Sequence, residues 1–139
     1  MFPGNLFTFI FNSNINIIIM TTQDVADRFM ELAKENKYDQ IQDELYSQDC
    51  ESIEPANGAE MGLLNAKGMD AIQEKGKRFN ESIEEMHGGY ANDPVVAPNH
   101  FALAMGMDVT MKGAGRIKMD ELAVYEVLEG KIIKEQFFY

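Results

Sequence analysis

One glutamate in the middle of the chain stands where burial could turn it into a proton acceptor. Glu54 ends a short strand-like run, Cys50-Glu51-Ser52-Ile53-Glu54, and is followed by Pro55. If helices cover that strand end, loss of water disfavours the charged carboxylate and raises its pKa toward the range of a general base. The alternative is a solvated loop glutamate. Glu54 is therefore a candidate base, and both interpretations stay open.

A second carboxylate, Asp108, lies inside a long alternating segment, residues 101–111. Bulky residues share one face of this predicted strand, and Ala102, Ala104, Gly106 and Asp108 share the other. Small side chains leave room above a sheet for a helix or a ligand. Asp108 then either enters a pocket or reaches water near a strand end, and the pattern favours neither.

Metal and cofactor chemistry finds little support in the sequence. The histidines, His87 and His100, have no second His or Cys nearby, and Cys50 is the single cysteine. We interpret Cys50 as a small buried hydrophobe and expect a reducing cytoplasm as the compartment. Gly113-Ala114-Gly115 is a turn with no helix after it to hold a phosphate. We therefore expect no metal and no cofactor.

The elements that must position these carboxylates are three helices and a meander. Helical periodicity covers residues 21–36, 38–45 and 68–86, and the third stretch places Ile72, Gly76 and Phe79 on one face. Strand patterns cover residues 50–54, 90–97, 101–111, 117–127 and 131–139. Two glycine turns, Lys112-Gly113-Ala114-Gly115 and Leu128-Glu129-Gly130-Lys131, separate the last three strands. The sequence predicts an antiparallel meander with helices over one face.

Composition limits the class of protein and of partner. A chain of 139 residues suits one domain, and its formal net charge of -11 disfavours nucleic acid and anionic membrane surfaces as partners. Residues 1–19 carry no charge, and 13 of them are Phe, Asn or Ile. We expect this leader to lie outside the fold, as translated upstream sequence before a start at Met20 or as a disordered segment, with an atypical signal or membrane anchor as the alternative. Residues 20–139 are expected to form the single domain.

The order of elements resembles the SnoaL-like branch of the nuclear transport factor 2-like superfamily. The resemblance is carried by the Phe29 helix, Ile53-Glu54-Pro55, the start of the third helix at Lys67-Gly68-Met69-Asp70, Val124-Tyr125-Glu126-Val127 and Gly130-Lys131-Ile132. It implies an α+β fold in which three N-terminal helices wrap a curved, mixed or antiparallel sheet into a cone with an internal pocket. It also implies a homodimer through the outer sheet face.

The same resemblance implies which residues face the pocket. Compared with the ketosteroid isomerase pattern, Glu54 matches the base, but Phe29 stands at the position of the oxyanion-hole Tyr and the neutral Asp falls near Ala123. Without those two donors steroid isomerisation by that mechanism is not expected. The comparison puts Tyr125, Glu135, Phe137 and Tyr139 on the cavity side, and Glu121 shares a face with Tyr125.

Two functions follow as hypotheses. In the first, the protein is a cofactor-free acid–base enzyme acting on a small apolar carbonyl compound. Its base is Glu54, Asp108 or Glu135, and Phe29, Glu121, Tyr125, Phe137 and Tyr139 contact the substrate. In the second, the same fold is a non-catalytic ligand carrier or a dimeric adaptor. Turnover that is lost in Glu54→Gln while binding is kept would favour the enzyme.

Overall fold

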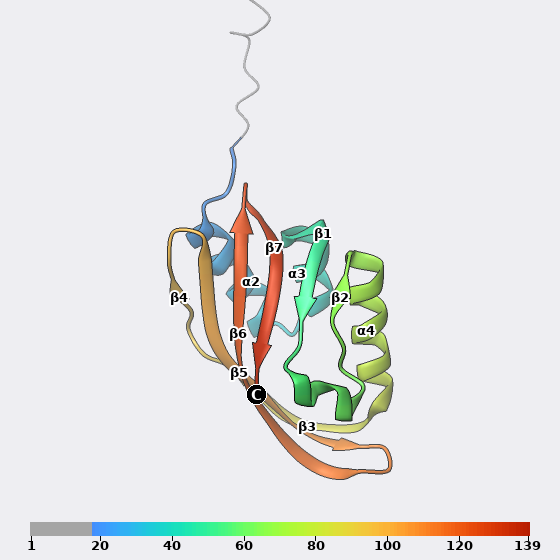
Figure 1. Ribbon diagram of the computed structural model, residues 1–139. Coiled ribbons are helices and arrows are strands. Elements are labelled where there is room, and N and C mark those ends of the chain that lie inside the picture. The colour runs from blue at the N-terminus through green and yellow to red at the C-terminus, as the bar shows by residue number, and fades with distance from the viewer. Residues whose placement is uncertain (1–17) are drawn as a thin grey trace, which may run out of the picture.

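The computed structural model describes residues 18–139 as a sheet with helices over one face (Figure 1). The predicted leader falls on residues 1–19, and residues 1–17 of it lie outside the described part. The elements are α2 (Thr22–Lys34), α3 (Tyr38–Leu45), β1 (Tyr46–Ile53), the 3-10 helix η1 (Ala56–Met61), β2 (Ala66–Lys67), α4 (Met69–Ser82), β3 (Ile83–Ala91), β4 (Val95–Val96), β5 (His100–Met111), β6 (Gly115–Leu128) and β7 (Lys131–Phe138). The predicted α+β class is confirmed.

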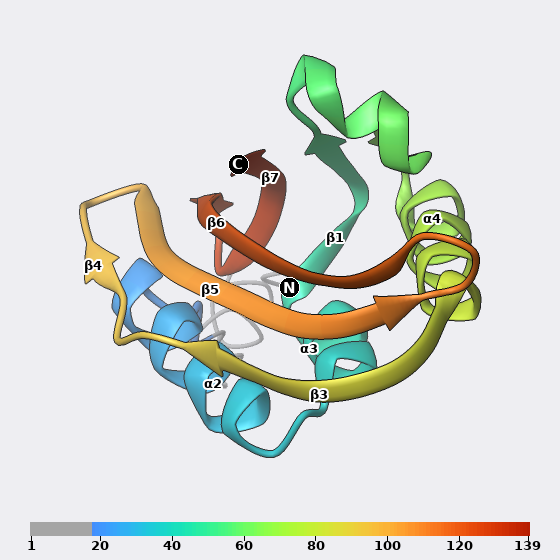
Figure 2. The ribbon, with the colours of Figure 1, turned by 90° about the horizontal axis from the view of Figure 1, so that it is seen from below.

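The seven-stranded sheet has the order β2-β1-β7-β6-β5-β3, and β4 pairs with β5. Among the described strands, β1 and β7 form the one parallel pair. Parallel strands need a long connection, and most of the chain lies between β1 and β7, whereas short turns join the antiparallel strands β5, β6 and β7. Figure 2 shows β3, β5 and β6 as one curved band around the helices. The predicted meander and both glycine turns are present.

The first two helices form where local signals are strongest. Thr21 and Asp24 make a capping box at the start of α2, and Val25, Phe29 and Leu32 are buried on its inner face. In α3 the buried positions are Ile41 and Leu45. Both helices lie behind the sheet in Figure 1 and cover one of its faces.

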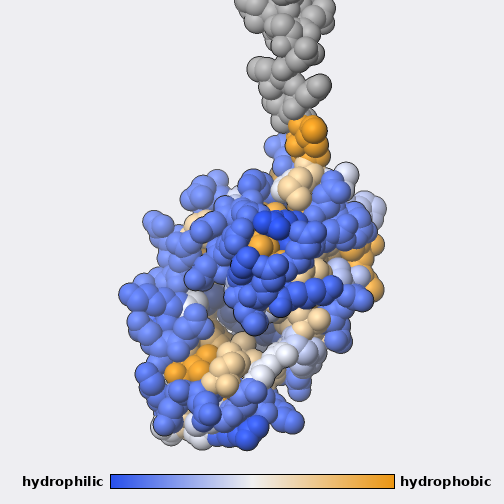
Figure 3. Space-filling model, turned by 180° about the vertical axis from the view of Figure 1, so that it is seen from behind, coloured by the Kyte–Doolittle hydropathy of each residue, from blue (hydrophilic) through white to orange (hydrophobic). Residues whose placement is uncertain are grey.

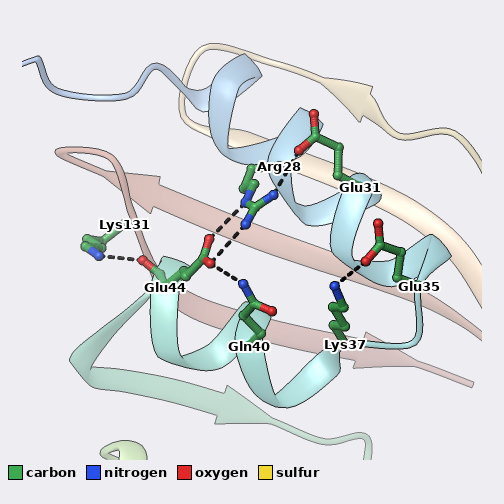
Figure 4. Close-up of polar contacts among 7 residues, drawn as sticks. All are labelled: Arg28, Glu31, Glu35, Lys37, Gln40, Glu44 and Lys131. Carbon is green, nitrogen blue, oxygen red and sulfur yellow. Dashed lines mark hydrogen bonds and ion pairs between the residues drawn. The ribbon is translucent and has the colours of Figure 1, made fainter.

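A polar cluster ties these two helices together at the surface (Figure 4). Arg28 of α2 donates to both carboxylate oxygens of Glu44 in α3, at 2.9 and 3.0 Å, and also to Glu31 at 3.1 Å. Gln40 donates to Glu44 as well, and the Lys131 ammonium donates to the Glu44 backbone carbonyl at 2.6 Å. The helical cover is thereby attached to the start of β7.

The predicted third helix is too long at its C-terminal end. The pattern extended it to about Met86, but α4 ends at Ser82, and Ile83 and Met86 belong to β3. Pairing between β3 and the long strand β5 decides this, because Ile83 lies opposite Met111 and Met86 lies opposite Val109. Ladder hydrogen bonds to a twelve-residue strand outweigh a local helical pattern.

Other boundaries also differ from the expectation. The first strand begins at Tyr46 rather than Cys50, directly after α3, and it pairs with β7 from that residue onward. Residues 55–67, for which the sequence predicted no helix or strand, contain η1 and all of β2. The strand predicted for residues 90–97 is divided between the end of β3 and the two-residue β4.

The bulky face of β5 points toward the helices. Phe101 and Leu103 are buried there, and Phe101 stacks on Tyr125 of β6 with ring centroids 4.8 Å apart. Phe29 of α2 completes this aromatic cluster, 4.9 Å from Tyr125 and 5.5 Å from Phe101. The small face, which carries Asp108, therefore points away from the core.

Candidate functional site

A cavity of about 1080 Å³ opens between the helices and the concave face of the sheet. Its walls come from all three helices and from β3, β5, β6 and β7, and they combine apolar and aromatic side chains with charged groups, among them Lys34, Lys37 and Lys75 on the helical side. Seen from behind (Figure 3), hydrophilic groups surround a hollow between the helices, with apolar residues visible below it. The volume fits a small organic molecule.

Glu54 lies at this cavity in a buried ion pair. Its Oε1 atom is 2.7 Å from the Lys75 ammonium, and its Oε2 atom accepts a hydrogen bond of 2.9 Å from the Tyr139 hydroxyl. The Glu54 and Lys75 side chains are 5% and 13% exposed. Both carboxylate oxygens therefore have a hydrogen-bond partner, and one of the two partners is a cation.

The C-terminal residue reaches Glu54 because Gly58 leaves space for it. A Cβ atom on Gly58 would lie 2.5 Å from the Tyr139 hydroxyl oxygen and 3.4 Å from Cβ of Glu54. Asn57 donates to the Tyr139 backbone carbonyl at 3.4 Å. Tyr139 does not line the cavity itself, but η1 holds its hydroxyl against a carboxylate that does.

Glu135 of β7 is the most deeply buried carboxylate at the site. Burial raises its pKa, while hydrogen bonds from the Tyr46 and Ser52 hydroxyls and the charge of Lys75 act in the opposite direction. Lys75 also donates to Ser52, so α4, β1 and β7 share one polar network. Glu135 is held in a fixed orientation by neutral donors.

Glu121 of β6 completes the set of carboxylates that line the cavity. Burial raises its pKa to about 7, and the charges of Glu54 and Glu135 add to this effect, while Lys75 opposes it. Among the described residues, no side chain donates a hydrogen bond to Glu121 or forms an ion pair with it. The interior thus places three carboxylates near one ammonium group.

Aromatic residues supply much of the apolar wall. Phe29, Tyr125 and Phe137 line the cavity, as the resemblance implied, and the Lys75 ammonium lies 5.9 Å from the centre of the Phe137 ring. Tyr125 is 2% exposed, and its hydroxyl is 4.0 Å from the Met105 sulfur. A thioether is a weak acceptor, so this buried hydroxyl retains the capacity to donate to a ligand.

Asp108 lies outside this cavity. Arg116 donates to both of its carboxylate oxygens, at 2.8 and 2.9 Å, across the β5–β6 hairpin. The arginine hydrogen bonds hold the pKa of Asp108 below its usual value. The helices pack on the bulky face of β5, so the small face and its carboxylate point away from the pocket.

Lys75 was not among the residues predicted for the site. A signal was available, because Lys75 is three residues after Ile72 and four before Phe79, and both of those lie on the apolar stripe. Tyr46 and Ser52 were also missed. Tyr46 precedes the predicted strand, and Ser52 lies within it, where alternation separates two faces without saying which one points inward.

Cys50 and the histidines contribute no metal site. Cys50 is buried, and burial raises the pKa of its thiol to about 12, which leaves it protonated. Within residues 18–139 no group of three His, Cys, Asp or Glu side chains is arranged to hold a metal ion. In that same range no helix is long and apolar enough to cross a membrane.

Comparisons with known proteins agree with this architecture. A family model described as the SnoaL-like domain matches residues 20–139. The crystal structure of a candidate SnoaL-like polyketide cyclase from Mesorhizobium loti is 34% identical, covers 86% of this chain and 100% of its own, and superposes with a TM-score of 0.79. No curated protein matches the chain.

More distant structures share the fold. An NTF2-like protein of unknown function from Burkholderia pseudomallei is 12% identical, covering 87% of this chain and 92% of its own, with a TM-score of 0.70. TerC, co-crystallised with polyporic acid, is 14% identical, covering 78% of this chain and 83% of its own, with a TM-score of 0.63. The protein belongs to the SnoaL-like domain family and has the nuclear transport factor 2-like fold.

Proposed function

We propose that the cavity binds a small, mostly apolar carbonyl compound and that Glu135 accepts a proton from the carbon next to the carbonyl group. The observation that carries this proposal is a buried, hydrogen-bonded carboxylate in an apolar cavity, beside a tyrosine hydroxyl that has no strong acceptor. Burial makes the Glu135 carboxylate a stronger base than an exposed one.

The remaining steps use neighbouring groups. Tyr125 donates a hydrogen bond to the carbonyl oxygen as negative charge develops there, and Phe29 and Phe137 form the walls that hold the carbon skeleton. Glu135 then returns the proton to the same or another carbon of the enolate. Return to the same carbon gives exchange, and return to another carbon gives the product of an isomerase. In a cyclase type of reaction the enolate carbon instead bonds to a second carbonyl carbon of the compound, and the proton from Glu135 goes to the oxygen of that carbonyl. In a dehydratase type of reaction the C–O bond of a β-hydroxyl group breaks, and the proton leaves with that hydroxyl as water.

Glu54 has a different role in this proposal. Its two oxygens accept hydrogen bonds from Lys75 and Tyr139, so we assign it the role of fixing the Lys75 ammonium at the cavity wall. Asp108 takes no part, because Arg116 neutralises it outside the cavity. A general base is usually held in place by a hydrogen bond from a neighbouring group, and within the described residues no side chain donates one to Glu121. We therefore assign Glu121 to ligand contact rather than to proton transfer.

The relatives support this class of function. TerC was crystallised with a small organic ligand, polyporic acid, and the structure from M. loti is that of a candidate polyketide cyclase. Both are properties of those proteins, and the shared fold supports our proposal of ligand binding in the equivalent cone.

We also propose a reducing cytoplasm as the compartment, because the single cysteine, Cys50, has no second cysteine in the chain with which to form a disulfide.

A deuterium exchange experiment tests the chemistry. 2-Tetralone is a small, largely apolar ketone whose C1 protons exchange in D2O, and proton NMR follows their loss. We expect faster exchange with the protein than in buffer, and a loss of about tenfold or more of the protein-dependent rate in Glu135→Gln. Glu126→Gln is the matched control, because Glu126 lies on β6 outside the cavity lining.

Two results would contradict the enzyme proposal. Equal exchange by wild type and Glu135→Gln would remove Glu135 as the base. Binding of 2-tetralone in the cavity, seen as shifts of Tyr125 and Phe137 signals, without any accelerated exchange would favour the non-catalytic ligand carrier.

We also propose a homodimer through the outer sheet face. Leu122 and Phe138 lie opposite each other on β6 and β7, and they are 44% and 48% exposed. Adjacent apolar side chains on an open sheet face are typical of a subunit contact. Sedimentation of the wild-type chain as a dimer and of Leu122→Lys as a monomer is the expected result, and a monomeric wild type would contradict it.

A further inference from the structure

The charges around the cavity do not balance. Glu54, Glu121 and Glu135 all line it, and Lys75 is the lining lysine whose ammonium pairs with one of them, Glu54. The other lining lysines, Lys34 and Lys37, are exposed, and Lys37 pairs with Glu35. The ammonium of Lys75 is already shared between Glu54 and Ser52. Glu135 receives its hydrogen bonds from neutral hydroxyls, so negative charge in excess remains near Glu121.

We propose that the ligand of this cavity carries a protonated amine or quaternary ammonium group, which binds beside Glu121 against the aromatic wall. The inference rests on the proposed ligand-binding role of the cavity. With the proposed proton transfer it adds ketones that also carry an amine to the substrate class and disfavours acidic ketones.

Two aromatic residues shape the place that such a cation would occupy. Tyr38 of α3 and Tyr125 of β6 both line the cavity, and burial raises the pKa of each phenol. The charge of Glu121 adds to the rise for Tyr38, and the charges of Glu135 and then Glu121 add to it for Tyr125. Aromatic faces attract cations, and the attraction grows when water is excluded. The Tyr125 hydroxyl, buried and aimed at the thioether of Met105, adds an oxygen without a strong partner.

The protonation state of Glu121 follows from the missing positive charge. Its pKa of about 7 is caused first by burial and then by Glu54 and Glu135. The titratable groups that face it from the surrounding elements are Tyr38 on α3, Lys75 on α4, Tyr90 on β3, Tyr125 on β6, Glu135 on β7, and Glu54 and Tyr139 at the ends of β1 and β7. A bound cation would supply the missing charge and ionise Glu121.

The charge of the whole chain acts in the same direction. A formal net charge of -11 raises the local concentration of small cations and lowers that of anions. An anionic ligand would have to approach this surface and then enter a cavity that already holds three acidic groups. Cationic ligands face neither obstacle.

Choline and its neutral carbon isostere, 3,3-dimethyl-1-butanol, make the test, because they have the same shape and differ in charge. Chemical-shift titrations of the full chain give both dissociation constants for the wild type, Glu121→Gln and the control Glu126→Gln. We expect the wild type to bind choline at least tenfold more tightly than the isostere, and Glu121→Gln to lose most of that preference. Glu126→Gln should keep it.

The pH dependence provides a readout that does not require a variant. If ionised Glu121 is the competent form, its fraction rises about tenfold between pH 6 and pH 8, and the affinity for choline should rise by the same factor. The affinity for the isostere should stay flat. Parallel titration of both probes separates this effect from any change in the fold.

Three outcomes would overturn the inference: equal affinity for the two probes, a choline preference that survives Glu121→Gln, or binding of neither probe. Binding of the isostere in the cavity together with accelerated 2-tetralone exchange would leave the proposed function intact while the cation site fails. Choline preference without any exchange of 2-tetralone would support the cation site and count against the proton-transfer chemistry.

Discussion

Two clusters of charged side chains in the protein shift the pKa of a glutamate in opposite directions. At the surface between α2 and α3, Arg28 and Gln40 hold Glu44, and their hydrogen bonds lower its pKa to about 2. In the cavity, Glu121 has a pKa of about 7 because burial and two other carboxylates act on it. The pKa of a glutamate is thus lowered in one cluster and raised in the other within one small domain.

The difference lies in how completely each cluster is neutralised. Glu44 accepts from several donors in contact with water, so its charge costs little (Figure 4). Of the lysines that line the cavity, Lys34 and Lys37 are exposed, so Lys75 is the cation that offsets the buried carboxylates there. A buried carboxylate without a matching positive charge destabilises the folded state, and the rest of the structure must offset that free energy. Such carboxylates are frequently found at functional sites.

The largest effect is expected when the one interior cation is removed. Lys75→Met leaves Glu54 buried without its ion-pair partner and takes away the charge that lowers the pKa of Glu121 and Glu135. Removing one partner of a buried pair typically costs about 3–5 kcal/mol. Urea unfolding at pH 7.5 should show this loss in the free energy of unfolding.

The neighbouring Lys77 gives the control for that measurement. It is exposed on the outer side of α4, so Lys77→Met should leave the free energy of unfolding nearly unchanged. Adding Glu54→Gln to Lys75→Met should recover part of the lost stability, because the unpaired charge disappears. Similar stability of the two lysine variants would mean that Lys75 carries no special role in the interior.

The pH dependence of stability should reveal Glu121 next. Below pH 4.5 this carboxyl is protonated in both the folded and the unfolded chain, so it has no effect on stability. As pH rises from 4.5 to about 7, the unfolded chain loses the proton first, and the folded state becomes less stable by on the order of 3 kcal/mol. Above pH 7 the penalty is complete.

Glu121→Gln should therefore be more stable than the wild type at pH 8 and not at pH 4. Chemical unfolding at the two pH values measures the difference, with Glu126→Gln as the matched control on the same strand. If the difference in the free energy of unfolding between Glu121→Gln and wild type were the same at pH 4 and pH 8, the negative charge of Glu121 would already be compensated in the free protein.

Much of the fold was accessible from the sequence because its signals are local. The signals for the helix predicted over residues 21–36, which carries Phe29, and for the turns around Gly113 and Gly130 each act within a few residues, and the structure has these elements where they were expected. Gly113 and Gly130 adopt positive φ angles of 76 and 76 degrees, which favours glycine at these turns.

The misplaced features depend on partners distant in the chain. The end of α4 is set by the pairing of β3 with β5, and the side on which Asp108 lies is set by which face of β5 the helices cover. Lys75 becomes an interior residue only because Glu54 and Ser52 come to it from β1. Alternation along one strand separates two faces but does not say which one is inside.

The smallest effect is expected at the surface cluster. Arg28→Met removes both hydrogen bonds to Glu44 and the contact with Glu31, yet all three side chains are at least one-third exposed. Water and salt replace much of what an exposed ion pair provides, so the melting temperature should fall only slightly and far less than in Lys75→Met.

Salt then distinguishes the two clusters directly. Raising the ionic strength to 1 M shortens the screening length to about 3 Å and should abolish the remaining difference between Arg28→Met and wild type. The loss caused by Lys75→Met should persist, because Glu54 stays out of reach of dissolved ions. If 1 M salt abolished the stability loss of Lys75→Met as well as that of Arg28→Met, dissolved ions would reach the interior cluster as easily as the surface cluster. Those ions would then compensate the charge of Glu121, and no cationic ligand would be required.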